Sequence, residues 1–228
     1  MGEEIQDHNH IRVEGLSHAY GQTSILDTLN LTLKPGQRLA VMGPSGTGKS
    51  TLLNCLAGLE SIQSGEVFAM GHPLHKLDEP ARAEIRRQHF GIVFQFFHLL
   101  PTLTARENVE LPLLMQGHRL AERREMADHM MNQVGLSHRL HAYPETLSGG
   151  ERQRAAIARA LITKPGILFA DEPTGNLDAA TGSAILDLLE NLMDREGTTF
   201  VMVTHSNEAA AICHQRMSLN HGKLQNLD

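Results

Sequence analysis

The sequence has no long hydrophobic run. Its most apolar segment, GIVFQFFHLLPTL at residues 91–103, is too short and too interrupted to span a bilayer, which requires about 20 apolar residues in a helix. The first ten residues, MGEEIQDHNH, are acidic and polar and lack the apolar core of a secretory signal, and we expect the first few to be mobile. We therefore expect a cytoplasmic chain that contacts a membrane only through a partner.

Cysteines and an excess of basic residues are also lacking. Cys55 and Cys213, the two cysteines, lie far apart without the spacing of metal ligands, which indicates a reducing compartment and packing roles. The 20 Lys and Arg residues stand against 26 Asp and Glu, for a net charge of −6. A chain with a net negative charge does not attract nucleic acid overall, so we expect no nucleic-acid partner. The balance does not exclude a local basic patch.

Internal repeats and low-complexity segments are absent too, and the fold class follows from hydrophobic periodicity. Alternating apolar residues indicate strands, and leucines spaced three and four apart indicate helices. The order of these segments is typical of a parallel sheet wrapped by helices, preceded by a small antiparallel sheet. In the first half of the chain we expect strands at 11–21 and 29–43 with a KPGQ turn, a helix at 50–59, strand and turn at 64–74, and a helix that leads into a strand over 79–95. A charged helical block follows at 106–141. In the last part we expect a strand at 166–174, a helix at about 181–196, and strand character at 198–206 and 217–228.

The segment VMGPSGTGKSTLL, residues 41–53, carries the first chemical signal. Gly43, Gly48, Lys49 and Ser50 fit the pattern G-x-x-x-x-G-K-[ST], in which backbone N–H groups close around phosphates at a helix N-terminus. The lysine of this pattern reaches the β and γ phosphates, and the Ser50 hydroxyl is a ligand for Mg²⁺. An ordinary glycine-rich turn is the alternative, but the expected strand before the segment and helix after it favour a phosphate site.

The segment ILFADEPT, residues 167–174, carries the second signal. Asp171 and Glu172 directly follow a buried apolar strand, and ligands of open α/β sheets bind at the ends of such strands. Asp171 fits the magnesium shell, and Glu172 is placed to polarise a water in line with the γ phosphate. The alternative is that both carboxylates merely begin a turn.

A third segment, LSGGERQR at residues 147–154, opens a further helix with a serine and two glycines. The bare amides of its first turn offer a second anion site, which one phosphate tail does not need unless the site serves another molecule. By itself the segment is equally compatible with an N-capped surface helix with a basic face.

Together and in this order, the three segments resemble the nucleotide-binding subunit of an ATP-binding-cassette (ABC) transporter over nearly the full chain. The resemblance implies an α/β P-loop NTPase core with an N-terminal antiparallel β portion and a helical subdomain. It divides one ABC ATPase domain into residues 1–94 (β portion and P-loop core), about 95–160 (helical subdomain and signature helix) and 161–228 (rest of the core). Two copies of the chain would enclose two nucleotides head to tail, with ATP and Mg²⁺ as cofactors.

The same resemblance assigns roles residue by residue. Tyr20 matches the aromatic residue that stacks on adenine, and Gln95 matches the glutamine that touches magnesium and the attacking water. Asp178 matches the aspartate that crosses the dimer interface, and His205 matches the histidine that contacts the γ phosphate. Glu151 replaces the commonest glutamine at the end of the signature. The implied nucleotide-binding set is Tyr20, Gly43, Pro44, Ser45, Gly46, Thr47, Gly48, Lys49, Ser50, Thr51, Ser148, Gly149, Gly150 and Asp178; the catalytic set is Glu172, His205, Lys49 and Gln95; and the metal set is Ser50, Gln95 and Asp171.

Within the family, FQFFHLLPTLTARENVELPL at residues 94–113 and DEPTGNLD resemble most the branch of lipoprotein-release, macrolide-export and cell-division ATPases. This branch implies a permease partner with a large extracytoplasmic domain, a place on the cytoplasmic face of the inner membrane, and export or extraction of a lipid, lipoprotein or hydrophobic compound. Phe94, Phe96, Phe97, Leu99 and Leu100 around Gln95 either form a groove for that partner or fill the core. Met126, Met130, Met131 and Val134 at helical spacing favour a core role. A regulatory ATPase of a cell-envelope complex and a soluble ABC ATPase remain as alternatives, whereas a small-molecule kinase has no use for a signature helix.

Overall fold

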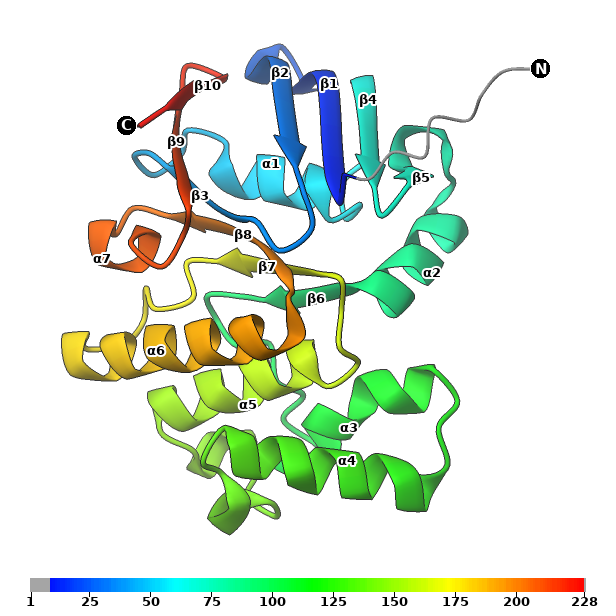
Figure 1. Cartoon of the computed structure of the whole chain (residues 1–228), viewed down its shortest axis with the longest axis vertical. Coiled ribbons are helices and arrows are strands. Elements are labelled where there is room, and N and C mark those ends of the chain that lie inside the picture. The colour runs from blue at the N-terminus through cyan, green and yellow to red at the C-terminus, as the bar shows by residue number, and fades with distance from the viewer. Residues whose placement is uncertain (1–8, 228) are drawn as a thin grey trace.

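The computed structural model describes residues 9–227, so the mobility expected for the first few residues concerns a part of the chain outside this range. Two sheets stack with the helix of residues 49–56 between them, and the long helices between residues 105 and 196 lie on the far side of the larger sheet (Figure 1). The smaller sheet has the strand order β2-β1-β4-β5 and the larger one the order β10-β9-β3-β8-β7-β6. The strands are β1 Ile11–Tyr20, β2 Thr23–Leu33, β3 Arg38–Met42, β4 Ser64–Ala69, β5 His72–Pro73, β6 Phe90–Val93, β7 Ile167–Asp171, β8 Thr199–Thr204, β9 Gln215–Asn220 and β10 Lys223–Asn226.

The smaller sheet is antiparallel throughout, whereas β3, β6, β7, β8 and β9 of the larger sheet run parallel. Parallel strands that are buried on both faces consist of nearly continuous apolar residues. Successive side chains of β3 point to opposite sides: Leu39 and Val41 pack against α1 and the smaller sheet, and Ala40 and Met42 pack against the helices of the far face. The larger sheet therefore separates two hydrophobic cores, and its carboxyl ends form one edge.

Helices connect these strands as expected from the sequence, with one difference. They are α1 Lys49–Leu56, α2 Glu79–His89, α3 Ala105–Met115, α4 Leu120–Gln133, α5 Gly149–Leu161, α6 Ala179–Glu196 and α7 Asn207–Ala210, together with the 3-10 turns η1 Leu74–Lys76, η2 Ser137–Arg139 and η3 Pro144–Thr146. The difference is the short α7, which the sequence did not predict. The expected helical block at 106–141 contains α3 and α4, which end where Gly117 (φ 86°) and Gly135 (φ 73°) adopt left-handed backbone conformations.

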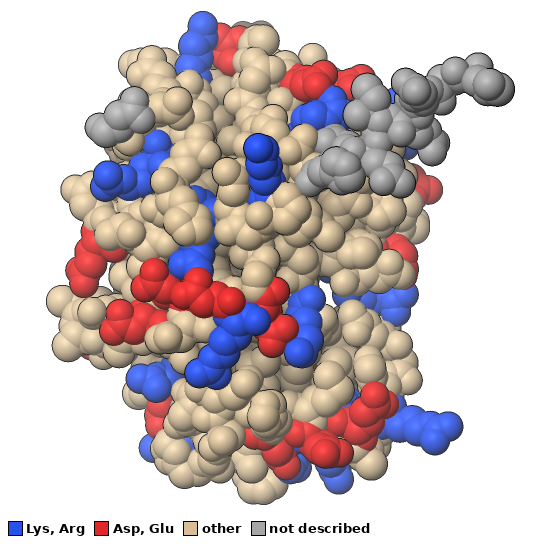
Figure 2. All heavy atoms as spheres, in the orientation of Figure 1, with Lys and Arg blue, Asp and Glu red and all other residues tan. Residues whose placement is uncertain are grey.

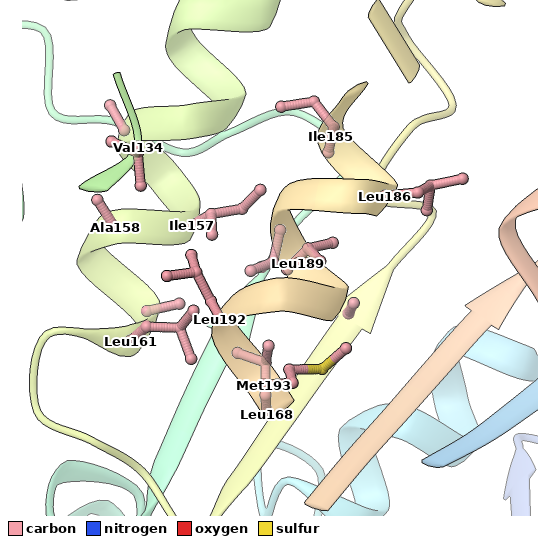
Figure 3. Close-up of a cluster of buried hydrophobic side chains, with 14 of the residues drawn as sticks. Val134, Ile157, Ala158, Leu161, Leu168, Ile185, Leu186, Leu189, Leu192 and Met193 are labelled. Carbon is pink, nitrogen blue, oxygen red and sulfur yellow. The ribbon is translucent and has the colours of Figure 1, made fainter. Parts of the chain in front are cut away.

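The core on the far face joins α5 and α6 to β7. Figure 3 shows Ile157 and Leu161 of α5 facing Leu189 and Leu192 of α6, whereas Ala158 lies on the side of Val134. The core extends from there to α3 and α4, where Met131 and Val134 are buried and Met126 and Met130 pack partly buried against it, as the sequence suggested. The signature helix is thereby fixed between the sheet and the small helical layer.

Charged side chains lie outside these cores. Figure 2 shows acidic side chains gathered along α6, with basic and acidic side chains interspersed on the helices below it. The buried Arg38 at the start of β3 pairs with two of these acidic groups, Glu190 and Asp194. Within residues 9–227, no helix combines the length and the apolar character that crossing a membrane requires.

Candidate functional site

The loop between β3 and α1 is shaped by glycines. Gly48 caps α1 with φ 97°, and a Cβ at this position would lie 2.5 Å from Cγ2 of Ile25. At Gly43 a Cβ would lie 2.8 Å from the carbonyl oxygen of Leu219. Side chains at these two positions would push the loop away from β2 and β9, so the glycines allow the backbone to wrap closely over the end of β3.

Lys49 lies beneath this loop. Its ammonium group donates hydrogen bonds to the carbonyl oxygens of Gly43 (2.7 Å) and Pro44 (2.9 Å), and only 7% of the residue is exposed. The hydroxyl of Thr47 also donates to the Pro44 carbonyl, at 3.0 Å. These bonds hold the loop closed and place a positive charge at the first turn of α1, where the helix dipole already attracts anions.

A cavity of about 330 Å³ opens in front of the loop. The carboxyl ends of three further strands contribute to it: Gln95 follows β6, Asp171 and Glu172 end β7, and His205 follows β8. This is the edge at which open α/β sheets bind ligands. The lining residues are Ile25, Ser45, Gly46, Gly48, Lys49, Ser50, Thr51, Gln95, Asp171, Glu172 and His205.

The two carboxylates of the cavity have different surroundings. Burial raises the pKa of Asp171, which also accepts a hydrogen bond from Ser50 and lies near the charge of Glu172. Glu172 adopts a left-handed backbone conformation (φ 45°) and uses both carboxylate oxygens. Oε2 accepts a hydrogen bond from the Thr204 hydroxyl at 3.0 Å, and Oε1 lies 2.8 Å from Nδ1 of His205. The Glu172 side chain is thereby fixed between β7 and β8.

The segment after Glu172 joins the cavity to neighbouring loops. Asn176 donates a hydrogen bond to the carbonyl oxygen of Gln95 at 2.8 Å. The buried Gln153 of α5 donates to the carbonyl oxygen of Pro173 at 2.7 Å. The segments that carry Gln95 and Glu172 are therefore tied both to each other and to α5.

The N-terminus of α5 forms a separate exposed surface. Ser148 and Glu151 make a reciprocal capping box, which satisfies amides at the helix start. A Cβ at Gly150 would lie 2.7 Å from Cγ2 of Thr181, in the first turn of α6. Asp178 caps α6 by accepting hydrogen bonds from the backbone and the hydroxyl of Thr181. The starts of α5 and α6 therefore pack directly against each other.

The structure divides the residues singled out from the sequence into three groups. Those in the cavity are Ser45, Gly46, Gly48, Lys49, Ser50, Thr51, Gln95, Asp171, Glu172 and His205; Gly43, Pro44 and Thr47 complete the loop behind it; and Tyr20, Ser148, Gly149, Gly150 and Asp178 do not line it. Tyr20 is 51% exposed at the end of β1 and packs edge-on against His18.

Sequence analysis missed three residues that act on the site. Ile25 lines the cavity, Thr204 bonds Glu172, and Gln153 bonds the segment after Glu172. Thr204 directly precedes His205 and could have been found from that position. Ile25 and Gln153 come close to the site only because segments far apart in the chain pack together, which no local pattern in the sequence indicates.

Sequence comparison relates the chain to known proteins. Residues 26–175 match the family model described as ABC transporter. The chain is 51% identical over 221 residues to the uncharacterized ABC transporter ATP-binding protein YbbA of Escherichia coli (strain K12), covering 95% of this chain and 97% of that protein. It is 47% identical over 203 residues to the lipoprotein-releasing system ATP-binding protein LolD of Shewanella denitrificans, covering 89% and 87%. It is 43% identical over 221 residues to LolD of Xanthomonas euvesicatoria pv. vesicatoria, covering 95% and 91%.

Solved structures share the whole architecture. The dimeric post-hydrolysis state of the ATP-binding cassette MJ0796 bound to ADP and Pi has a TM-score of 0.88 and 37% identity, covering 96% of this chain and 98% of that chain. A second dimeric structure of MJ0796, described as a bacterial ABC transporter cassette, has a TM-score of 0.87 and 39% identity, covering 94% and 96%. These likenesses confirm the fold class predicted from the sequence.

Proposed function

Because the chain belongs to the ABC transporter family, we propose that its ATP hydrolysis drives the export or extraction of a lipid, a lipoprotein or another hydrophobic compound. Family membership confirms the resemblance seen in the sequence, the ATPase activity and the use of ATP. The observation that carries the finer proposal is the 47% and 43% identity to lipoprotein-releasing system ATP-binding proteins over most of the chain.

The cavity fits the phosphate tail of ATP. We propose that the loop from Gly43 to Thr51 wraps the phosphates with its amides and that Lys49 exchanges its two carbonyl partners for β and γ phosphate oxygens. Tyr20, exposed at the end of β1, stacks on the adenine ring.

Hydrolysis requires a base close to the γ phosphate, and Glu172 has the position and the support for this role. Its carboxylate accepts a proton from the attacking water, and Thr204 and His205 fix its orientation through the bonds described above. His205 is exposed at the mouth of the cavity, where it can turn to the γ phosphate, and Gln95 faces the water from the opposite strand end. A local network of this kind acts by positioning and electrostatic stabilisation.

The residues present fit Mg²⁺. Ser50 and Asp171 bring a hydroxyl and a carboxylate into hydrogen-bonding contact at the cavity, with the amide oxygen of Gln95 among the lining groups. Oxygen ligands together with phosphates are the set this ion prefers. Within the described residues, no group of three or more His, Cys, Asp and Glu forms an alternative metal site. When bound, Mg²⁺ would neutralise charge on the phosphates.

Ser148, Gly149, Gly150 and Asp178 lie outside the cavity of their own chain. The first three form the start of α5, a helix N-terminus suited to an anion, and Asp178 caps the neighbouring start of α6. We assign them to the nucleotide held by a second copy, so that two chains close head to tail over two ATP molecules. The structures of MJ0796 are dimeric, which supports this arrangement. We assign residues 95–160 to the helical subdomain that presents the signature helix, and the rest of the described chain, 9–94 and 161–227, to the core.

A groove of about 250 Å³ lies between α2, β6, α3 and α5, with Phe90, Leu111 and Met115 among its lining residues. Phe96 beside Gln95 is 67% exposed, and Leu100 is exposed as well, whereas Leu99 packs against the core. Phe96 and Leu100 do not line the groove, but Met115 in its lining is 59% exposed. An exposed apolar side chain at a concave surface fits an apolar helix of a partner. We propose that an integral-membrane permease with a large extracytoplasmic domain docks here, and that the chain is a peripheral protein on the cytoplasmic face of the inner membrane.

The dimer is tested by size-exclusion chromatography with light scattering on the parent chain and Glu172→Gln, with and without ATP and Mg²⁺. Removing the base should trap an ATP-bound dimer of the variant, while ADP leaves it monomeric. A variant that binds ATP normally and turns it over at the parent rate would show that Glu172 is not the base.

The cargo is tested by purifying the tagged chain from its own membranes with the integral protein that accompanies it. The complex, reconstituted in vesicles, should release a lipid-anchored protein or a lipid in an ATP-dependent manner, and Glu172→Gln serves as the matched control. ATP-dependent periplasmic hydrolase activity without release would favour the regulatory alternative, and the absence of any membrane protein would favour a soluble ATPase.

A further inference from the structure

The signature segment contains a carboxylate, Glu151, whose negative charge would repel the nucleotide phosphates proposed to bind there. Glu151 is the third residue of α5, and the N-terminus of this helix is assigned to the phosphates bound by the partner copy. The start of a helix carries about half a positive charge, which a nearby ionised carboxylate more than cancels. A glutamine at this position would bring no such charge.

The structure shows how this charge is held. Oε2 of Glu151 accepts a hydrogen bond from the backbone N–H of Ser148 at 2.8 Å, and Oε1 accepts one from Nε of Arg139 at 2.7 Å. His138 lies farther away, with Nε2 at 3.8 Å from Oε1. The Ser148 amide and the Arg139 guanidinium lower the pKa of Glu151, so the group is an ion pair at neutral pH.

Arg139 is not needed for the shape of its own turn. The backbone N–H of Arg139 donates to the carbonyl oxygen of Leu136 at 2.9 Å, and its carbonyl oxygen accepts from the N–H of Ala142, also at 2.9 Å. These backbone bonds define η2 without the side chain. The guanidinium is therefore free to serve Glu151, twelve residues further along the chain.

We propose that Arg139 is a positioning residue of the nucleotide site that two copies form. It neutralises Glu151 and keeps its carboxylate on the Ser148 amide, so that the start of α5 still attracts the triphosphate held by the partner copy. The inference rests on the two-copy arrangement proposed above and adds to it a residue outside the signature segment itself. The inference also predicts that Arg139 affects nucleotide-dependent dimerisation only as long as residue 151 is charged.

This dependence is tested with Arg139→Gln, Glu151→Gln and the double variant, each made in the Glu172→Gln background. The dissociation constant of the dimer is measured by analytical ultracentrifugation at saturating ATP and Mg²⁺. Arg139→Gln should weaken each site about 3- to 10-fold, as loss of a partly exposed charge pair does, and hence the dimer with its two sites about 10- to 100-fold. The double variant should return to within about threefold of the Glu172→Gln parent, because no charge is then left to neutralise.

Two controls separate this role from a structural one. Arg195→Gln removes an equal charge from the exposed C-terminal end of α6 and should leave the dimer unchanged. ATP binding to the monomer and the unfolding temperature should be the same in all variants, and 0.5 M salt should reduce the Arg139→Gln effect.

A double variant as weak as Arg139→Gln alone, or an Arg139→Gln dimer as tight as the parent, would overturn the inference while leaving the two-copy site intact. A Glu172→Gln parent that binds ATP and stays monomeric would overturn the two-copy site and this role with it.

Discussion

Gly150→Ala tests the packing of the signature helix against α6. A methyl group at this position would lie 2.7 Å from Cγ2 of Thr181, which is closer than carbon atoms approach. Thr181 cannot turn away without cost, because its hydroxyl donates to Oδ2 of Asp178 at 2.6 Å. The substitution therefore either strains the contact or breaks the bond that helps to fix Asp178.

The expected magnitude follows from opposing contributions. Replacing a helical glycine by alanine stabilises by at most about 1 kcal/mol, whereas overpacking costs about 1–3 kcal/mol and loss of the hydrogen bond about 1 kcal/mol. We expect Gly150→Ala to lower the free energy of unfolding by about 0–2 kcal/mol. Thr181→Ser removes the obstructing methyl and keeps the hydroxyl, so in that background Gly150→Ala should become neutral or stabilising.

Urea denaturation of the four proteins of this double-mutant cycle measures the coupling energy, which should be about 1–3 kcal/mol in favour of the double variant. A coupling energy near zero would mean that the starts of α5 and α6 do not touch. The packing argument for Gly150 would then be wrong, even if the single substitution proved harmful.

Two further results are expected. Gln153→Met leaves the buried carbonyl oxygen of Pro173 without its hydrogen-bond donor at 2.7 Å. The loss costs about 1–3 kcal/mol and should lower the unfolding temperature, measured by calorimetry, by about 2–12 °C. An unchanged unfolding temperature would contradict this hydrogen bond. Burial raises the pKa of Cys55 and of Cys213 to about 12, so the folded protein at pH 8 should react with thiolate-specific reagents far more slowly than the protein in denaturant; equal rates would contradict their packing.

The sequence predicts most of the fold because periodicity is a local property. The helix predicted at about 181–196 corresponds to α6 with a small shift at its start, and the strands predicted within 29–43 correspond to β2 and β3, although β2 already begins at Thr23. The block at 106–141 is helical as predicted, but its charged and apolar spacing does not show that it is divided at Gly117 and Gly135. The left-handed conformations of these glycines depend on how α3 and α4 fold back onto α5, which periodicity does not contain.

The site divides in the same way. The loop around Lys49 and the pair Asp171 and Glu172 are recognisable because their residues are contiguous and their chemistry needs fixed spacing. Thr204 on Glu172 and Arg139 on Glu151 join separate segments. Such contacts follow from the pairing of β7 with β8 and from the path of the chain before α5, so only the structure reveals them.

Residues of α5 beyond the signature segment also contact loops next to the cavity. Gln153 bonds the segment after Glu172, and Arg159 donates to the carbonyl oxygens of Phe97 and His98, at 2.8 and 2.5 Å. Phe97 and His98 both have positive φ values, 62° and 46°, a conformation that costs of order 1–3 kcal/mol per residue unless its surroundings fix it. Two bonds from a partly buried guanidinium offset such a cost. α5 therefore cannot shift relative to the sheet without moving the Gln95 loop or releasing its strain. Through α5, the proposed contact with the partner copy's nucleotide is mechanically linked to the residues proposed for hydrolysis in the chain's own cavity.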